Sequence, residues 1–406
     1  MMLIKLAYRN LWRNRRRTFI TIASVLFAVF FAVILRSMQT GVYEKMIENV
    51  VGYYSGYVQI HKNGYWNEQT IDNVIPFSDS LAAAIEDKDG VQTVLPRLEG
   101  FVLAATQELT KGALVNGIDP TKEGSMLQLE EKLIDGKVFA LEDQSVMMGS
   151  GVADYFGVGV GDTLVMLGQG YRGISARGKY VVSGIVKLNS PLLNDNLIFL
   201  PLPEAQWFYG AEGMVTSYVL DMNYRDNVPR FARSIESKLD TASYEVMAWQ
   251  EMMPELVQAI QADSAGGQIM LFILYMVITF GMFGTVLMMT AERTYEFGVL
   301  ISIGMKRWQL GLTVVFETIF ISIIGVIAGL VCAYPIVLYF NRNPLDLTGG
   351  AAQTIEEYGF EAVMPASLDP SISITHATII LIISILISIY PMFVLARLKP
   401  VKAMHV

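Results

Sequence analysis

The sequence predicts an α-helical membrane protein with four transmembrane helices and a large mixed α/β extracytoplasmic domain between the first and the second. Of the 406 residues, 53% are hydrophobic and only 17% are charged, whereas soluble domains carry about 25% charged residues. Most of the hydrophobic residues lie in four long runs, and a polar block, residues 37–266, separates the first run from the second. These observations exclude an ordinary soluble domain.

Each hydrophobic run is long enough, or nearly so, to cross the membrane, which takes about 20 apolar helical residues. The stretches Phe19–Leu35 and Ile269–Met289 contain no charged residue. The third run begins near Leu310 and ends at Phe340, and the fourth is Ile372–Ala396. Buried helices of a soluble core would carry a charged face, which these runs lack.

The flanking charges predict the orientation. Residues 1–17 carry basic side chains and no acid, and the 291–309 loop and the tail also carry basic clusters, whereas the 341–371 loop is mainly acidic. Positively charged flanks stay in the cytoplasm. Both termini are therefore expected on the cytoplasmic side of a bacterial inner membrane. The predicted segments are a cytoplasmic interfacial amphipathic helix (1–17), the first span (18–36), a periplasmic α/β domain with stalk helices at both ends (37–266), the second span (267–290), a cytoplasmic loop with a short helix (291–309), the third span (310–340), a periplasmic loop (341–371), the fourth span (372–396) and a cytoplasmic tail (397–406).

The first run is not expected to be a cleaved signal, because Arg36, Ser37 and Met38 follow it in place of a small-residue cleavage site. The residues before it place apolar side chains on one helical face and basic ones on the other. Such a helix is expected to lie on the inner leaflet.

The polar block is predicted to alternate short strands with turns and a few helices. The expected strands are Tyr57–His61, Val91–Leu95, Gly100–Ala105, Lys111–Gly117, Thr163–Leu167, Lys179–Lys187 and Thr216–Met222, and the expected helices are Ser78–Asp87 and Pro229–Leu239. Acidic residues outnumber basic ones by about two to one there, so nucleic acid is not an expected partner. The only cysteine, Cys332, lies in the third run, so no disulfide is expected in this domain.

Apolar residues at helical spacing continue from the first span and lead into the second, which predicts two stalk helices. On the outgoing side they include Met38 and Val42, and on the returning side Met252 and Met253 begin the stripe. The candidates for lining a lateral opening between the stalks are Met38, Val42, Leu256, Val257 and Ile260. Packing of the stalks against each other explains the same residues.

The sequence contains no recognisable catalytic constellation. No G-x-x-x-x-G-K-[ST] phosphate-binding loop is present, and the three histidines, His61, His376 and His405, are too far apart in the predicted topology for a zinc site. The glycine-rich stretch 157–161 precedes a strand, which is the wrong order for a dinucleotide loop. We therefore expect no catalytic residue, no metal ligand and no cofactor bound by this chain.

The 291–309 loop holds the most specific pattern. A short helix near Glu296–Ile303, ended by Gly304, would present Phe297, Leu300 and Ile301 beside charged residues. Such a helix either lies on the membrane surface or docks into a groove on a cytoplasmic partner. The residues alone leave both interpretations open.

This loop resembles the coupling segment of the permease family that includes FtsX, MacB, LolC and LolE. The family pattern E-R-x-x-E-F-G-x-L-x-x-x-G is matched by Glu292, Arg293, Glu296, Phe297, Gly298, Leu300 and Gly304. The basic opening at residues 7–18 and the ending Pro400–Met404 are also similar to the family. Residues 148–153 with 160–163, and 248–250 with 254–256, are similar to its lipoprotein-releasing branch.

The resemblance implies a MacB-like (type VII) ABC permease that transmits motion and does not hydrolyse ATP. ATP and Mg²⁺ would bind a separate soluble P-loop ABC ATPase, because the 17 residues before the first run leave no room for a fused one. Membrane lipids, a second permease copy or a paralogue, and a lipoprotein substrate are the other expected partners. The expected ATPase-coupling residues are Glu292, Arg293, Glu296, Phe297, Leu300, Gly304 and Arg307.

Within the spans, Glu317 is the one acidic residue. A charge at the bilayer centre costs about 3 kcal/mol or more. We therefore expect Glu317 to reach the lipid headgroups, to pair with Arg307 or Arg293, or to act in coupling. Gly325 and Gly329 form a G-x-x-x-G pattern, and small residues of this kind favour close helix packing, within one chain or across a dimer. Gly281 and Gly284 form a second small-residue face.

Three functions fit the resemblance. The first is extraction of lipoproteins from the inner membrane, the second is FtsX-like activation of cell-wall hydrolases, and the third is efflux of drugs or peptides. The branch-specific similarity and the stalks favour the first. The sequence does not identify the substrate or distinguish a homodimer from a heterodimer.

Overall fold

The computed structural model describes residues 2–13, 15–86, 88, 90–124, 126–222, 227–350, 352 and 361–397. The chain divides into two compact units. The helical unit comprises Met1–Glu44, Ile260–Asp346 and Val363–Val406, and the α/β unit comprises Lys45–Ala259 and Leu347–Ala362. The predicted tail motif at 400–404 lies outside the described residues.

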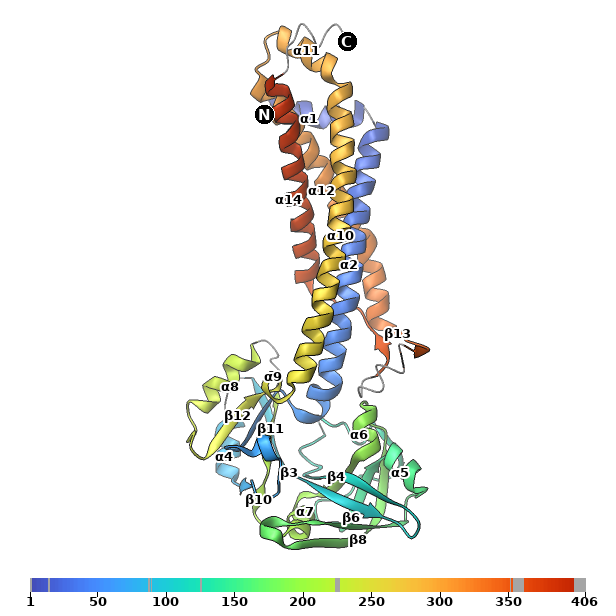
Figure 1. Cartoon of the computed structure of the whole chain (residues 1–406), viewed down its shortest axis with the longest axis vertical. Coiled ribbons are helices and arrows are strands. Elements are labelled where there is room, and N and C mark those ends of the chain that lie inside the picture. The colour runs from blue at the N-terminus through green and yellow to red at the C-terminus, as the bar shows by residue number, and fades with distance from the viewer. Residues whose placement is uncertain are drawn as a thin grey trace. The chain divides into compact units, whose positions relative to one another are not determined.

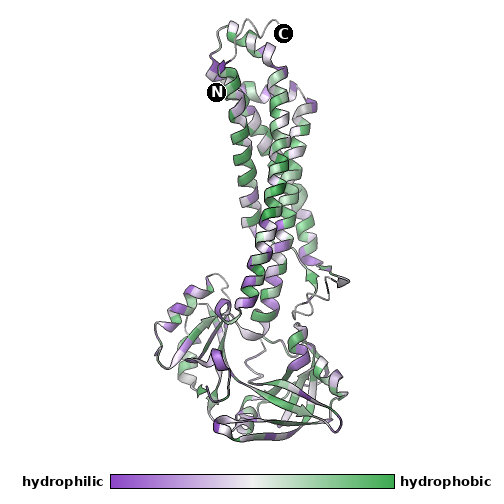
Figure 2. Ribbon diagram, viewed as in Figure 1, coloured by the Kyte–Doolittle hydropathy of each residue, from purple (hydrophilic) through white to green (hydrophobic). Residues whose placement is uncertain are grey.

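The helical unit contains the four helices that are long and apolar enough to cross a membrane. Figure 2 shows apolar residues along most of their length. The elements of this unit are α1 (Met2–Arg13), α2 (Arg15–Ile47), α10 (Pro254–Glu292), α11 (Thr294–Ser302), α12 (Arg307–Arg342), β13 (Leu345–Asp346), β14 (Val363–Met364) and α14 (Pro370–Arg397). The four predicted spans are confirmed as α2, α10, α12 and α14.

These four helices form one bundle (Figure 1) with a shared apolar core. Val25 of α2, Met282 of α10, Val326 of α12 and Ile380 of α14 all belong to one buried cluster. Large apolar side chains elsewhere on the helices, such as Phe272, are exposed. A bundle that is apolar both inside and outside is what a lipid environment requires.

For Gly325 and Gly329, the predicted close helix packing is confirmed, and it lies within one chain. A Cβ added to Gly325 would lie 2.6 Å from Val25 Cβ, and one added to Gly329 would lie 2.8 Å from Val29 Cβ. Because both positions lack a side chain, α2 can pack closely against α12. Gly281 and Gly284 differ, because no described atom comes within 4 Å of a Cβ at either position. Packing within the chain therefore does not explain the second small-residue face.

The α/β unit is built around a 10-stranded sheet, in the order β12-β1-β11-β3-β4-β9-β6-β8-β5, with β7 pairing to β3 and β8. The long strand β3 pairs with β11 through its first half and with β4 and β7 through its second half. The strands are β1 (Val58–Lys62), β2 (Ile75–Pro76), β3 (Val91–Ala105), β4 (Thr110–Ile118), β5 (Leu133–Gly136), β6 (Ser145–Gly149), β7 (Thr163–Gln169), β8 (Ser175–Val186), β9 (Leu197–Pro201), β10 (Met214–Val215), β11 (Ser217–Met222) and β12 (Tyr244–Ala248). The helices are η1 (Glu48–Ser55), α3 (Tyr65–Glu68), α4 (Asp79–Glu86), α5 (Ser150–Phe156), η2 (Tyr171–Gly173), α6 (Pro191–Asn196), α7 (Leu202–Tyr209), α8 (Val228–Glu236) and α9 (Trp249–Met252).

A buried ion pair joins distant parts of this unit. Arg97 of β3 is fully buried and donates to both carboxylate oxygens of Glu123, at 2.6 and 2.8 Å. Arg97 also donates to the backbone carbonyl of Tyr54 in η1. Because the carboxylate and the carbonyl share one guanidinium, the end of η1 is fixed to the central strand.

The predicted strands and helices of this unit are confirmed, with three differences. Val91–Leu95 and Gly100–Ala105 belong to the single strand β3. The predicted outgoing stalk changes at Glu48 to a π-helix, η1, which ends at Gly56, whose φ is 72°. The predicted returning stripe is also interrupted, because α9 ends at Met252 and a new helix begins at Pro254. Proline is favoured in the first turn of a helix but cannot continue one.

Candidate functional site

The predicted coupling segment is α11, a helix set between α10 and α12. Only Arg293 separates the end of α10 at Glu292 from the start of α11 at Thr294. At the other end, the Met305 amide donates to the Leu300 carbonyl and the Gly304 amide donates to the Ile301 carbonyl, both at 3.0 Å. Gly304 has a φ of 106°, so this is the glycine-terminated helix end that the sequence predicts.

Phe297 anchors α11 to the helical bundle. Its side chain is 2% exposed and belongs to a buried cluster with Leu310, Val314 and Leu395. The expectation that Phe297 lies on a partner-facing surface is therefore wrong for this conformation. Its face of the short helix is covered by α12 and α14 of the same chain, while Leu300 is half-buried at the edge of the cluster.

Ion pairs also attach the α11 segment to α12 and to α1. The Arg293 guanidinium donates to both carboxylate oxygens of Glu317, at 3.0 and 2.7 Å. Arg293 Nε lies 3.5 Å from Glu296, which also pairs with Arg13 of α1. Of the two partners predicted for Glu317, the structure therefore selects Arg293. Arg13 joins the network and was not predicted, because the sequence gives no sign of which basic residue of α1 approaches α11.

Arg307, the other predicted partner of Glu317, has a different contact. Its guanidinium donates to the carbonyl of Ala396 near the end of α14, at 2.9 Å. Basic side chains often bond the free carbonyls at helix C-termini. Arg307 therefore links α12 to α14.

The exposed part of the α11 segment carries apolar side chains that sequence reasoning missed. Tyr295 is 57% exposed and Ile303 is 78% exposed, and Trp308 at the start of α12 is also exposed. Glu292 lies on the exposed surface as well. Helical spacing alone does not distinguish these residues from the buried Phe297. A partner that docks on α11 would meet Tyr295 and Ile303 first.

The predicted stalk residues differ in their surroundings. Met38 packs against the bundle core, whereas Val42, Val257 and Ile260 are half-buried. Leu256 lines a cavity of the α/β unit. Among the described residues, no group of three or more His, Cys, Asp or Glu side chains is placed to hold a metal ion.

Two family models together match most of the chain. The MacB-like periplasmic core domain matches residues 18–238, and the FtsX-like permease C-terminal domain matches residues 268–400. Four spanning helices with an inserted α/β domain define a multi-pass inner-membrane permease. The chain belongs to the FtsX-like and MacB-like family of ABC transporter permeases.

Individual proteins are also similar to this chain. The lipoprotein-releasing system transmembrane protein LolC of Neisseria meningitidis serogroup B is 21% identical over 401 residues, which cover 96% of this chain and 94% of the relative. LolC of Xylella fastidiosa is 21% identical over 72% of this chain and 73% of the relative. The periplasmic region of MacB from Actinobacillus actinomycetemcomitans matches 53% of this chain and 98% of its own, with 16% identity and a TM-score of 0.37.

Proposed function

We propose that this chain is a permease subunit that uses the ATPase of a separate ABC subunit to extract lipoproteins from the inner membrane. The observation that carries the proposal is the similarity to LolC, which extends over 96% of the chain. In this proposal both termini and α11 lie in the cytoplasm, since basic residues flank these segments. The α/β unit then lies in the periplasm, and a second copy or a paralogue completes the transporter.

The contacts of α11 support transmission of motion. Phe297 is packed into a cluster with α12 and α14, and Arg293 is bonded to Glu317 of α12. A displacement of α11 by an ATPase would therefore be passed to two spanning helices through a packed side chain and an ion pair. Packed elements with discrete arrangements transmit displacement in this way, whereas loops absorb it.

The first experiment is purification of the tagged protein from its native membrane, followed by mass spectrometry. We expect a soluble ABC ATPase and lipidated proteins, and lipoprotein release into solution should require ATP. Recovery of the ATPase with a cell-wall hydrolase would replace lipoprotein extraction by signal transmission, and recovery with a periplasmic adaptor would replace it by efflux. Absence of an ATPase from intact complex would refute the proposed mechanism.

Variants of α11 test the docking surface. Tyr295→Ala is expected to lower permease-stimulated ATP hydrolysis about tenfold, a typical loss when a central aromatic contact is truncated, with an unchanged melting temperature. Trp207→Ala is the matched control, because Trp207 is equally an exposed aromatic residue but belongs to the α/β unit. Phe297→Asp should abolish stimulation for another reason, since it places a charge in a buried cluster and lowers the melting temperature. Full stimulation in Tyr295→Ala would remove this surface from the docking site.

A further inference from the structure

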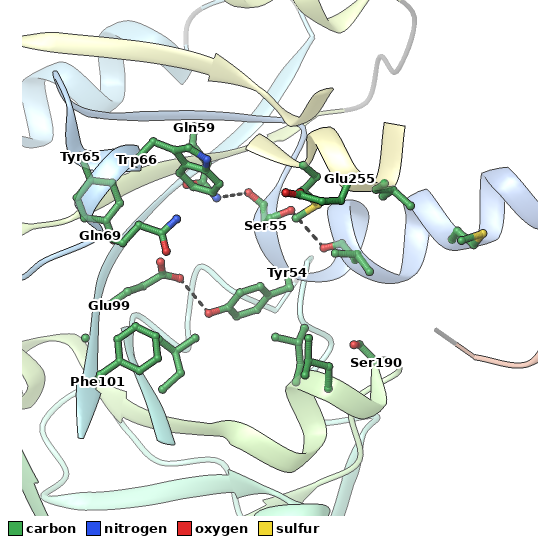
Figure 3. A pocket seen from close by; sticks show the side chains of 18 of the residues that line it. Tyr54, Ser55, Gln59, Tyr65, Trp66, Gln69, Glu99, Phe101, Ser190 and Glu255 are labelled. Carbon is green, nitrogen blue, oxygen red and sulfur yellow. Dashed lines mark hydrogen bonds between the residues drawn. The ribbon is translucent and has the colours of Figure 1, made fainter. Parts of the chain in front are cut away.

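The α/β unit contains an open cavity of about 580 Å³, within the usual range of small-molecule sites, about 300–1,000 Å³. Its walls come from segments far apart in the sequence: η1, α3, β3, α6 and the start of α10 (Figure 3). All the lining residues belong to the α/β unit. Neither the family models nor the named relatives assign a site here.

Two of the walls are fixed by buried or anchored groups. The carbonyl of Tyr54, in η1, accepts a hydrogen bond from Arg97, which is itself paired with Glu123. At another part of the wall, Glu245 accepts hydrogen bonds from the backbone amides of Gly64 and Trp66, at 3.1 and 3.3 Å, and so holds the start of α3. The cavity is therefore supported by contacts that exist without a ligand.

The lining is mainly apolar, with aliphatic and aromatic side chains. Met46, Val50, Leu193, Met253 and Leu256 form much of its surface. Methionine side chains adapt to ligands of irregular or variable shape. Phe101 and Leu192, at the cavity as well, are both exposed, so apolar surface extends to solvent.

Two polar groups of the cavity, Tyr54 and Gln59, have partners within the protein. The Tyr54 hydroxyl donates to Glu99 at 3.0 Å, and the Gln59 amide donates to the carbonyl of Ser55 at 2.6 Å (Figure 3). Burial and the neighbouring Glu99 raise the pKa of the Tyr54 phenol, so it stays a donor at neutral pH. Such groups offer little to a polar ligand.

The charge of the lining selects against anions. The described lining residues include two carboxylates, Glu99 and Glu255, and no lysine or arginine. A phosphate or carboxylate headgroup would be repelled inside the cavity and is expected to remain at its mouth. An apolar chain, in contrast, gains by leaving water.

The position of the lining in the sequence indicates the source of such a chain. Met46 lies ten residues after Arg36, which ends the first apolar run, and Ala259 lies eight residues before Gly267 at the start of the second predicted span (46 − 36 and 267 − 259). Part of the cavity wall is thus built by the segments that directly leave and re-enter the spans. Alkyl chains are the abundant apolar ligands beside a membrane.

We propose that this cavity binds one long alkyl chain, from a phospholipid or a lipidated protein, with its headgroup left outside. The inference goes beyond the proposed function, since it requires neither the ATPase nor lipoprotein release. It makes the α/β unit itself a lipid-chain-binding module.

Photo-crosslinking of the full-length protein in lipid nanodiscs tests the proposal. One probe is a phosphatidylethanolamine with a diazirine near the end of one acyl chain, and the other is a diacylglyceryl-cysteine peptide with the same diazirine chain. Adducts are mapped by mass spectrometry, and their yield is expressed relative to adducts around Phe272, an exposed apolar residue of α10. We expect adducts within residues 46–55, 190–193 and 253–259 with at least one probe, and the productive probe identifies the source of the chain.

Two variants make the result specific. Ala259→Trp adds a ring at the lining and should lower the cavity adducts about tenfold or more, whereas Gln258→Trp changes an adjacent exposed residue outside the lining and should leave them unchanged. If Ala259→Trp misfolds, Leu192→Glu replaces it, because Leu192 is exposed and tolerates a polar side chain. Adducts confined to the spans, adducts that both variants leave unchanged, or competition by the same peptide without its lipid would each overturn the proposal.

Discussion

The pair between Arg293 and Glu317 gives the sharpest quantitative prediction for the coupling segment. The Arg293 and Glu317 side chains are 12% and 5% exposed, and their closest N–O distance is 2.7 Å. Removing one partner of a buried pair costs about 3–5 kcal/mol, because the other charge stays buried without a partner. The two partners are not equivalent, however, since Arg293 keeps a second carboxylate, Glu296, at 3.5 Å.

We therefore expect Glu317→Leu to cost about 3 kcal/mol and Arg293→Met about 5 kcal/mol, the two ends of that range. The double variant should cost clearly less than their sum, because neither charge is then left alone. The assay is thermal unfolding in nanodiscs at a fixed scan rate, where each kcal/mol corresponds to about 2–4 °C for a domain of comparable size. Stimulated ATP hydrolysis is measured in parallel. Equal single losses that add in the double variant would refute the reasoning.

Three further changes test other contacts. Gly325→Leu should destabilise the bundle by about 1–3 kcal/mol, because the added side chain forces α2 away from α12. Gly281→Leu is its control and should leave the melting temperature of the monomer unchanged. A larger loss of stability in Gly281→Leu than in Gly325→Leu would contradict the packing. Arg97→Met leaves Glu123 buried without a cation and should cost about 3–5 kcal/mol by thermal unfolding; a neutral result would show that the pair contributes little. His61, whose Nδ1 lies 3.4 Å from a carboxylate oxygen of Glu245, lowers the pKa of that carboxyl group from its ordinary value. That stabilisation is complete above the unfolded pKa and is lost as pH falls through the folded one, so Glu245→Gln should show a shallower loss of stability below about pH 4.5; parallel curves would exclude it.

The sequence predicts best where one physical constraint dominates. Stretches such as Ile269–Met289 have no charge and are too long for anything but a span, and Gly304 marks the end of α11 because few other residues adopt its φ of 106°. Strand β9 was not predicted. All five of its residues are buried and it pairs in parallel with β4, so it lacks the alternation that reveals half-buried strands.

The candidate site was predicted in position but not in exposure. In α11, both Tyr295 and Phe297 are aromatic, and only the packing of α12 and α14 decides that Phe297 is buried. The cavity of the α/β unit could not be predicted either. Its walls come from segments as far apart as Met46 and Ala259 in the sequence, and their approach is a property of the folded sheet.

The position of Arg293 has a mechanical consequence. It is the single residue between α10 and α11, with φ −91° and ψ 6°, so any rotation of one helix relative to the other must pass through its backbone. Its guanidinium also forms the ion pair with Glu317. Arg293 is thus both the hinge between α10 and α11 and the residue that holds α11 to α12. A large rotation of α11 would therefore break its ion pair with Glu317. If an ATPase pushes α11 in the way proposed above, this ion pair would resist small displacements and would break under larger ones.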